Sequence, residues 1–275
     1  TQQNNTAGAD SAVLNAKDGV DVTIDVSAAT GNSKAFKLVG GTGKDTLKGG
    51  AGADTIEGGN AIDTIDGGGG IDTISGGAGD DIITGGAGND IITIDGGSDT
   101  VKDLGGAGGT DDDVVIINNG TTLNATDIIG FTATTGTQNN STGATNAVLN
   151  AKNGVDVTID VASAGGSSKA FKLVGGTGND SLTGGAGNDI IQGNNANDTL
   201  KGNDGNDVLT GGAGDDTLYG GNGDDIFNIS SGSDIIKDLS SGDDVIITGG
   251  SVIAEDVVAF TADSDTSNSG GTFEL

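Results

Sequence analysis

Several amino-acid types are missing from this chain, and their absence removes classes of structure and chemistry. Its 275 residues contain no cysteine, proline, methionine, tryptophan or histidine, and aromatic residues make up 3%. Without cysteine there is no disulfide framework to stiffen a small secreted domain. Without histidine or cysteine the usual nucleophile–base pairs cannot form, and neither a G-x-S-x-G elbow nor a phosphate-cradling lysine loop is present. We therefore expect that this chain is not an enzyme.

Basic residues and long apolar runs are also scarce. Eleven Lys and Arg residues stand against 40 Asp and Glu residues, which gives a net charge of −29. Such a chain repels nucleic acids and anionic membrane surfaces, which are bound through Lys and Arg. No apolar run approaches the roughly 20 residues that span a membrane, and Thr1 begins no signal-peptide pattern, as expected of a processed or excised start. The partners that this charge attracts are cations.

Glycine is abundant, with 55 residues, and it lies within repeats at two levels. At the longer level, AVLNAKDGVDVTIDV at 12–26 returns 135 residues later as AVLNAKNGVDVTIDV at 147–161. The C-terminal stretch 259–275 resembles 130–149. Because such repetition decides the fold, we predict two tandem units followed by the start of a further unit.

At the shorter level, a nine-residue period fills residues 40–102 and again residues 175–237. All fourteen sixth positions are Asp, all fourteen eighth positions are large and apolar, and glycine prevails at positions one, two and four. One inward-facing apolar residue per repeat cannot form a core, so neighbouring repeats must stack. The glycines supply tight turns and the last three positions supply very short strands. Two turns and two strands would close one coil.

Stacked coils bring the sixth-position carboxylates together. Asp would lie over Asp at about one strand spacing, roughly 4.8 Å, which is unfavourable unless a cation lies between them. Carboxylate and carbonyl oxygens select a hard ion, and a flexible shell suits Ca²⁺ better than Mg²⁺. We therefore expect several calcium ions in each block. We also expect the metal-free blocks to be largely unfolded, so that calcium binding and folding are one event.

The unit G-G-x-G-x-D-x-U-x, where U is large and apolar, resembles the repeat of RTX proteins, a calcium-binding family. The resemblance implies an all-β fold of right-handed parallel β-roll solenoids. It also implies export by a one-step bacterial secretion system, and calcium held by turn carbonyls and the sixth-position Asp. Carried over residue by residue, the metal ligands are Asp45, Asp54, Asp63, Asp72, Asp81, Asp90, Asp99, Asp180, Asp189, Asp198, Asp207, Asp216, Asp225 and Asp234.

Departures from the repeat indicate which of the expected calcium sites bind more weakly. Ala61 and Ala196 replace the fourth-position glycine in the third repeat of each block. Because Ala, unlike Asn or Gly, tolerates a positive φ poorly, we expect these turns to be strained and their calcium sites weak or empty. The coil should nevertheless continue through them.

The seventh repeats begin with Ile94 and Ile229 in place of glycine. We therefore expect each roll to end there, with Asp103 and Asp238 completing a last half-site. Solenoids need caps over their open ends, so the flanking segments are interpreted as further coils or short antiparallel strands. The expected domains are a β cap and linker at 1–39, the first roll at 40–102, a cap and linker at 103–174, the second roll at 175–237, and at 238–275 a cap with the start of a further unit.

Two functions fit this organisation. One is a secreted bacterial surface-layer protein that assembles by calcium-dependent folding and self-association, which the acidic, cysteine-free composition favours. The other is the calcium-rigidified stalk of a large RTX adhesin on the cell surface, which the tandem unit also suits. An export module behind a secreted hydrolase or toxin fits less well, because its roll is usually a single block. Ice binding would require a regular file of Thr and Asn at the third positions, which the sequence does not have.

Overall fold

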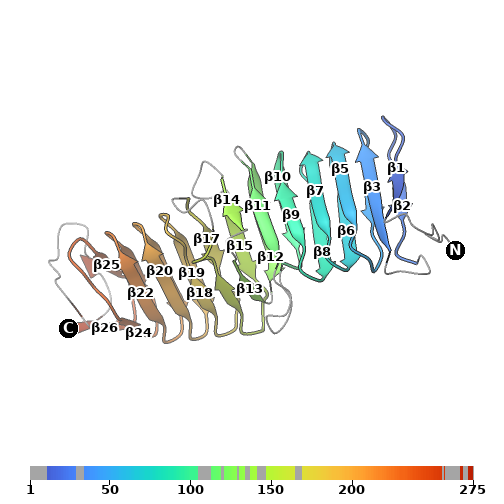
Figure 1. The fold of residues 1–275 in the computed structure, drawn as a ribbon. Coiled ribbons are helices and arrows are strands. Elements are labelled where there is room, and N and C mark those ends of the chain that lie inside the picture. Colours follow the sequence, from blue (N-terminus) through green and yellow to red (C-terminus); the bar gives the residue numbers. More distant parts are fainter. Residues whose placement is uncertain are drawn as a thin grey trace.

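The chain forms one long stack of short parallel strands in the computed structural model (Figure 1). The structure describes residues 11–28, 34–104, 113–118, 121–128, 130–133, 137–140, 147–164, 169–255, 257, 267–268 and 272–274. Within these ranges every regular element is a β-strand, and no helix could cross a membrane. The expected parallel β-roll is therefore confirmed.

The strands belong to three sheets, which we call A, B and C. Sheet A contains β1 (Ser11–Asn15), β3 (Ala35–Gly41), β5 (Thr55–Asn60), β7 (Thr73–Ala78), β9 (Ile91–Ile94), β11 (Val114–Ile117) and β14 (Gln138–Asn139). Sheet B contains β2 (Thr23–Asp25), β4 (Thr46–Lys48), β6 (Thr64–Gly69), β8 (Ile82–Ala87), β10 (Ser98–Lys102), β12 (Thr122–Ile128), β15 (Ala147–Ala151), β17 (Lys172–Val174), β19 (Ile190–Asn195), β21 (Val208–Ala213), β23 (Ile226–Ile229), β25 (Asp244–Ile247) and β27 (Ser267–Asn268). Sheet C contains β13 (Gly130–Thr132), β16 (Thr158–Asp160), β18 (Ser181–Thr183), β20 (Thr199–Asp204), β22 (Thr217–Asn222), β24 (Ser233–Ile236), β26 (Ser251–Ala254) and β28 (Thr272–Glu274).

Successive repeats alternate between two facing sheets, so that residues 18 apart become neighbours. In sheet B, Leu47 pairs with Ile65 and Ile65 with Ile83. These eighth-position side chains are at most 1% exposed and form a column through the inside of the roll. Each repeat thus buries its apolar residue against other repeats and not within itself, as a solenoid requires.

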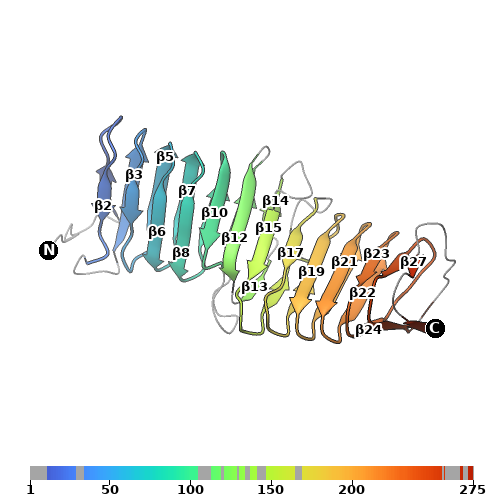
Figure 2. The same cartoon turned by 180° about the vertical axis from the view of Figure 1, so that it is seen from behind.

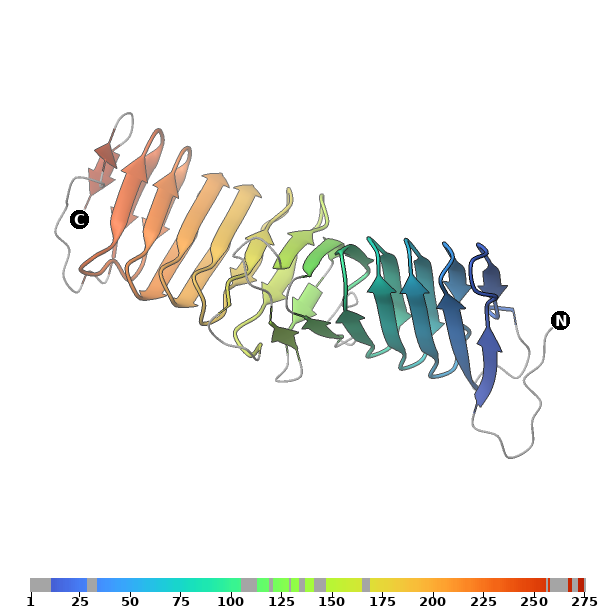
Figure 3. The same ribbon diagram turned by 90° about the horizontal axis from the view of Figure 1, so that it is seen from above.

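A coil of three strands joins the two blocks. After β12 in sheet B the chain forms β13 in sheet C and β14 in sheet A before it returns to sheet B as β15. Sheet A ends at β14 and sheet C begins at β13, whereas the 13-stranded sheet B runs through both blocks (Figure 2). Equivalent repeats of the two units consequently lie in different sheets. Figure 3 shows the two blocks and the joining coil between them from above.

The flanking segments are further coils of the same stack. The two alternatives for them were extra coils and antiparallel strands, and every described strand pair is parallel. The seventh repeats do not end the sheets either, because Val115 pairs with Ile92 and Val245 with Phe227. The reason is that the spacing of Asp and apolar residue recurs beyond each block, at Asp113 with Val115 and at Asp243 with Val245.

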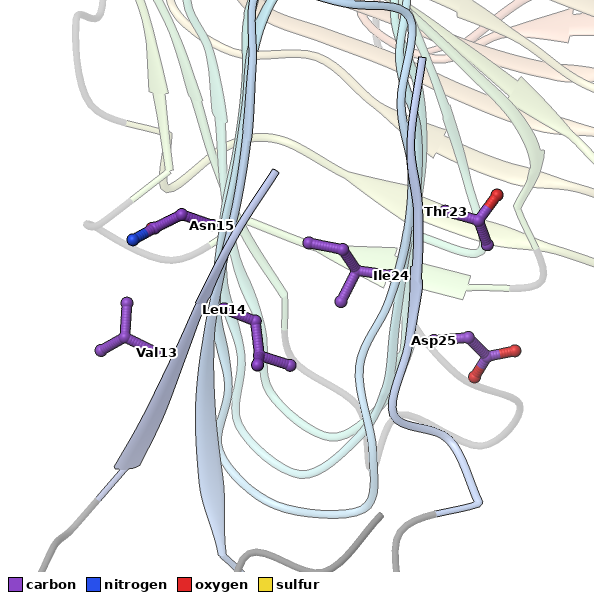
Figure 4. A pocket seen from close by; sticks show the side chains of 6 residues that line it. All are labelled: Val13, Leu14, Asn15, Thr23, Ile24 and Asp25. Atoms are coloured by element: carbon purple, nitrogen blue, oxygen red, sulfur yellow. The ribbon is translucent and has the colours of Figure 1, made fainter. Parts of the chain in front are cut away.

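The first end of the stack shows how the interior is built. β1 and β2 face each other there, and Leu14 and Ile24 point toward one another between them (Figure 4). Their neighbours Val13 and Thr23 point away on the outer faces. The same alternation points apolar side chains into the interior from the strands of both RTX blocks.

Candidate metal-binding turns

In each block the sixth-position aspartates form two buried ladders, one along each edge where the turns stack. Each carboxylate lies inside the roll just before its strand or, for Asp99 and Asp234, within it, and all fourteen residues are at most 2% exposed. The Oδ1 atom of each accepts the backbone N–H of a residue one coil earlier. Asp45 N–H donates to Asp63 Oδ1 at 2.7 Å and Asp189 N–H to Asp207 Oδ1 at 2.7 Å. The stacking of Asp over Asp that the period predicts is therefore present.

The ladders extend one step beyond each block, to residues that the nine-residue period misses. Asp90 N–H donates to Asp113 Oδ1 at 2.9 Å, and Asp225 N–H donates to Asp243 Oδ1 at 3.0 Å. Asp113 and Asp243 are at most 3% exposed. The spacing from Asp to the apolar residue two positions later would have found them, because it persists where the glycines do not.

The second carboxylate oxygen, Oδ2, has no such donor in most of the ladder. Within the described residues it is buried without a hydrogen-bond partner in Asp45, Asp63, Asp72, Asp81, Asp99, Asp198, Asp207, Asp216, Asp225 and Asp234. An unpaired buried oxygen of a charged group costs on the order of several kcal/mol. These oxygens therefore call for a positive partner.

Two kinds of oxygen converge where the first-position glycine lies. A Cβ placed on Gly40 would lie 2.7 Å from Asp45 Oδ2 and 2.2 Å from the carbonyl oxygen of Gly58, in the next coil. A Cβ on Gly202 would lie 2.1 Å from Asp207 Oδ2 and 2.5 Å from the carbonyl oxygen of Gly220. Only glycine fits at this position, and the oxygens around it are those of a carboxylate and a peptide carbonyl. That donor set fits Ca²⁺.

No group of three or more acidic side chains gathers at one point among the described residues. The carboxylates are instead spread along the stack, one per turn. A cation bound here would complete its shell with backbone carbonyls, which matches the ligand set that the sequence implies.

Burial makes these carboxylates hard to ionise without a cation. It raises the pKa of Asp207 to about 8 and that of Asp198 to about 7, and the neighbouring carboxylates of the ladder add to the rise. Backbone N–H donors act in the opposite direction but do not offset the loss of water. A bound divalent ion would supply the missing positive charge.

Three turns differ from the others, and we call them closed turns. Their Asp54, Asp180 and Asp189 use Oδ2 to accept the N–H of the second turn residue, at 2.7 Å from Gly50, 2.6 Å from Gly176 and 2.6 Å from Gly185. We call a turn open when its Oδ2 lacks that donor and its second residue has a positive φ. Gly59 at 113°, Gly212 at 118° and Asn203 at 79° are second residues of open turns, whereas no positive φ occurs at the second residue of a closed turn.

The two alanine turns are strained as the sequence predicts. Ala61 has a φ of 75° and Ala196 a φ of 73°, both in the left-handed region. The coil nevertheless continues, with Asp63 fully buried and Ile65 1% exposed. The weakness of calcium binding at these turns stays a prediction.

The ends of the blocks are filled by protein groups. Ile94 and Ile229 stand at the first position in front of Asp99 and Asp234, and both isoleucines are at most 1% exposed. Asp238 accepts N–H groups from the turn one coil earlier, from Gly220 at 2.9 Å and Gly221 at 3.0 Å. That residue therefore reaches the turn of the sixth repeat in the second block. Whether it completes a calcium half-site stays a prediction.

Comparison with known families bears directly on these turns. The family model described as "RTX calcium-binding nonapeptide repeat" matches four segments, at residues 37–65, 66–101, 172–200 and 201–236. Both blocks consist of RTX repeats. No curated protein matches the chain. The RTX segments contain all fourteen sixth-position aspartates, while Asp113 and Asp243 lie outside them.

Proposed function

We propose that this chain is a structural module of a secreted bacterial cell-surface protein, stiffened by calcium ions bound in its RTX turns. The observation that carries the proposal is the convergence of buried Oδ2 atoms and glycine carbonyls at positions where only glycine fits. All fourteen sixth-position aspartates are candidate calcium ligands, because they lie in the RTX repeats. The open turns that begin with glycine have the donor set that suits a cation best.

Calcium would act here as the counter-charge of the stack. The net charge of −29 and the raised pKa values of the buried aspartates both oppose folding when no cation is bound. Each bound ion would link the carboxylate of one coil to the carbonyl of the next. Folding and binding are then coupled, because the unfolded chain holds no such arrangement of oxygens.

The continuous stack favours a load-bearing rod on the cell surface. Sheet B passes through both units without interruption, and β1 and β26 lie at opposite ends of the molecule (Figure 1). A module that joins end to end suits the stalk of an adhesin. The acidic, cysteine-free composition supports the second candidate, a surface layer, which would further require lateral contacts between rods.

Calcium titration of the chelated chain tests the proposal. We expect circular dichroism to change from a disordered to a strand spectrum as calcium is added, at concentrations of about 10⁻⁴–10⁻³ M if the chain resembles other extracellular modules. Magnesium at the same concentration is the control and should have a much smaller effect. A strand spectrum that is already complete in chelator would contradict the proposal.

Electron microscopy of the calcium-loaded chain separates the two assemblies. Isolated extended particles are expected for a stalk module, and two-dimensional sheets for a surface layer. The same sample in chelator serves as the reference for calcium dependence.

A further inference from the structure

We propose that the three closed turns take no calcium, and that the pair at residues 175–189 keeps the start of the second block folded when calcium is removed. The inference rests on the proposed function, since it divides the RTX turns into those that bind the ion and those that replace it. Its basis is the set of protein donors that occupy the closed turns.

The first donor is a backbone amide. In the closed turns the N–H of Gly176 reaches Asp180 Oδ2, and the N–H of Gly185 reaches Asp189 Oδ2, both at 2.6 Å. The partial positive charge of each N–H therefore lies against the oxygen that would otherwise bind the cation. An ion could enter only if the peptide turned away and this hydrogen bond broke.

The second donor is a side-chain amide, and it occurs at both closed turns of the second block. Asn194 Nδ2 donates to the carbonyl oxygen of Gly175 at 2.7 Å, and Asn203 Nδ2 donates to that of Gly184 at 2.7 Å. The carboxylate of each closed turn and the carbonyl of its own first glycine are thus both satisfied by protein groups, whereas the carbonyls that converge on Asp180 Oδ2 and Asp189 Oδ2 are those of Gly193 and Gly202 in the next coil. In the first block the equivalent second residues are Gly59 and Gly68, which have no side chain to donate.

The closed pair also rests on apolar coils that precede the repeats. Phe171 N–H donates to Asp189 Oδ1 at 2.7 Å and Val157 N–H to Asp180 Oδ1 at 2.8 Å. Phe171 is 4% exposed and Val157 is 2% exposed. This part of the roll therefore has a core and satisfied polar groups without any ion.

The two kinds of turn differ by the orientation of the peptide between the first and second residues. Glycine at the second position can adopt either sign of φ, whereas alanine disfavours the positive sign. A Cβ on Gly185 would meet only the Val161 carbonyl oxygen at 3.6 Å and the Phe171 ring at 3.9 Å, which are ordinary contacts. A Cβ on Gly212, in an open turn with φ at 118°, would lie 2.1 Å from the Asn194 carbonyl oxygen.

These contacts supply a matched pair of variants for the full chain. The first variant combines Gly185→Ala with Gly50→Ala in the closed turn of the first block and should keep both turns closed. A Cβ on Gly50 would be 3.6 Å from the nearest atom, which is an ordinary contact. Gly212→Ala disturbs an open turn. The number of calcium ions per chain is measured by equilibrium dialysis, and hydrogen exchange is followed at the Gly176 and Gly185 amides with and without calcium.

We expect Gly50→Ala/Gly185→Ala to fold in calcium and to bind as many ions as the unaltered chain. Gly212→Ala should raise the calcium midpoint of folding roughly tenfold or more. The Gly176 and Gly185 amides should stay protected in chelator while amides of the open turns exchange.

Three results would overturn the inference: fewer bound ions in Gly50→Ala/Gly185→Ala, failure of that variant to fold in calcium, or full exchange of both amides in chelator. A chain that binds no calcium at all would instead refute the proposed function. The two failures are therefore distinguishable.

Discussion

The two RTX blocks have the same ladder of buried aspartates but differ at the exposed fifth position beside it. In the second block Asn197 N–H donates to Asn179 Oδ1 at 3.0 Å, and Asp215 N–H donates to Asn197 Oδ1 at 2.9 Å, so that polar side chains link one coil to the next. In the first block the fifth positions include Ile62 and Ile71, which cannot accept a hydrogen bond and are 45% and 62% exposed. The second block thus has an outer ladder that the first largely lacks.

From this difference we expect that repeats of one family need not depend on calcium equally. The second block also contains two of the three closed turns, whereas the first contains one. Both features replace a cation or water by a protein group. We therefore expect the variable positions of the nonapeptide to set how much of the stack survives without metal.

Calcium removal should produce the largest difference in stability between the two blocks. We expect chelator to unfold the first block at a higher free calcium concentration than the second, because each extra hydrogen bond contributes about 0.5–1.5 kcal/mol. Hydrogen exchange read by mass spectrometry at stepped calcium concentrations would locate the loss. Simultaneous loss of protection in residues 46–102 and 181–237 would contradict this order.

Acidification should partly replace calcium, and more so in the second block. Burial raises the pKa of Asp207 to about 8 and those of Asp198 and Asp234 to about 7, from an ordinary value of 3.8. In the first block it raises those of Asp72 and Asp99 to about 7.

The sign of the pH effect follows from these values. Between pH 3.8 and about 6–8 the metal-free folded state binds more protons than the unfolded state, so the free energy of unfolding falls as pH rises through this window. In chelator we expect more strand signal by circular dichroism at pH 5 than at pH 8. A stability that rises with pH in chelator would show that these carboxylates are not buried.

Relief of the strained alanine turns should stabilise both blocks by a smaller amount. Ala61→Gly and Ala196→Gly remove a side chain from a left-handed conformation, and each should gain about 1 kcal/mol in thermal unfolding with calcium present. Ala51→Gly is the control, because Ala51 has no positive φ, and it should lose stability. Equal effects at Ala51 and Ala61 would mean that the turn is not strained.

Extension of the outer ladder into the first block should give the smallest effect. Ile62→Asn is expected to place an acceptor one coil before the Asp80 N–H, as Asp80 Oδ1 now accepts the Ser98 N–H at 2.8 Å. We expect about 0.5–1 kcal/mol of added stability in urea unfolding with calcium present. The reverse change, Asn197→Ile, should destabilise the second block by a similar amount. A stabilising Asn197→Ile would rule out the ladder as the cause.

The sequence predicts the roll because two residues per repeat set its geometry. Asp at the sixth position and an apolar residue at the eighth fix which side chains point inward, as Asp63 and Ile65 do. The positive φ at Ala61 also follows from its position in the turn. The three-stranded joining coil does not, because no G-G-x-G-x-D segment precedes β13 or β14.

The repeat motif does not predict which turns are closed either. The same tetrapeptide, Gly-Gly-Ala-Gly, forms a closed turn at 49–52 and 184–187 and an open turn at 76–79 and 211–214. Both closed copies stack on a flanking coil, whereas both open copies stack on another repeat. The tetrapeptide Gly-Gly-Thr-Gly also differs between the blocks, since it forms an open turn at 40–43 and a closed turn at 175–178 although both copies stack on a flanking coil. Neither the tetrapeptide nor the kind of neighbouring coil alone therefore decides the conformation.

The location of bound ions in a crystal of the calcium-loaded chain tests the central claim most directly. Anomalous scattering from calcium, or from a lanthanide in its place, should give peaks between an Asp Oδ2 and the glycine carbonyl of the next coil, as at Asp207 and Gly220, and no peak at Asp189. Peaks only at exposed acidic side chains, with the Oδ2 atoms of the open turns still without a partner, would contradict the account.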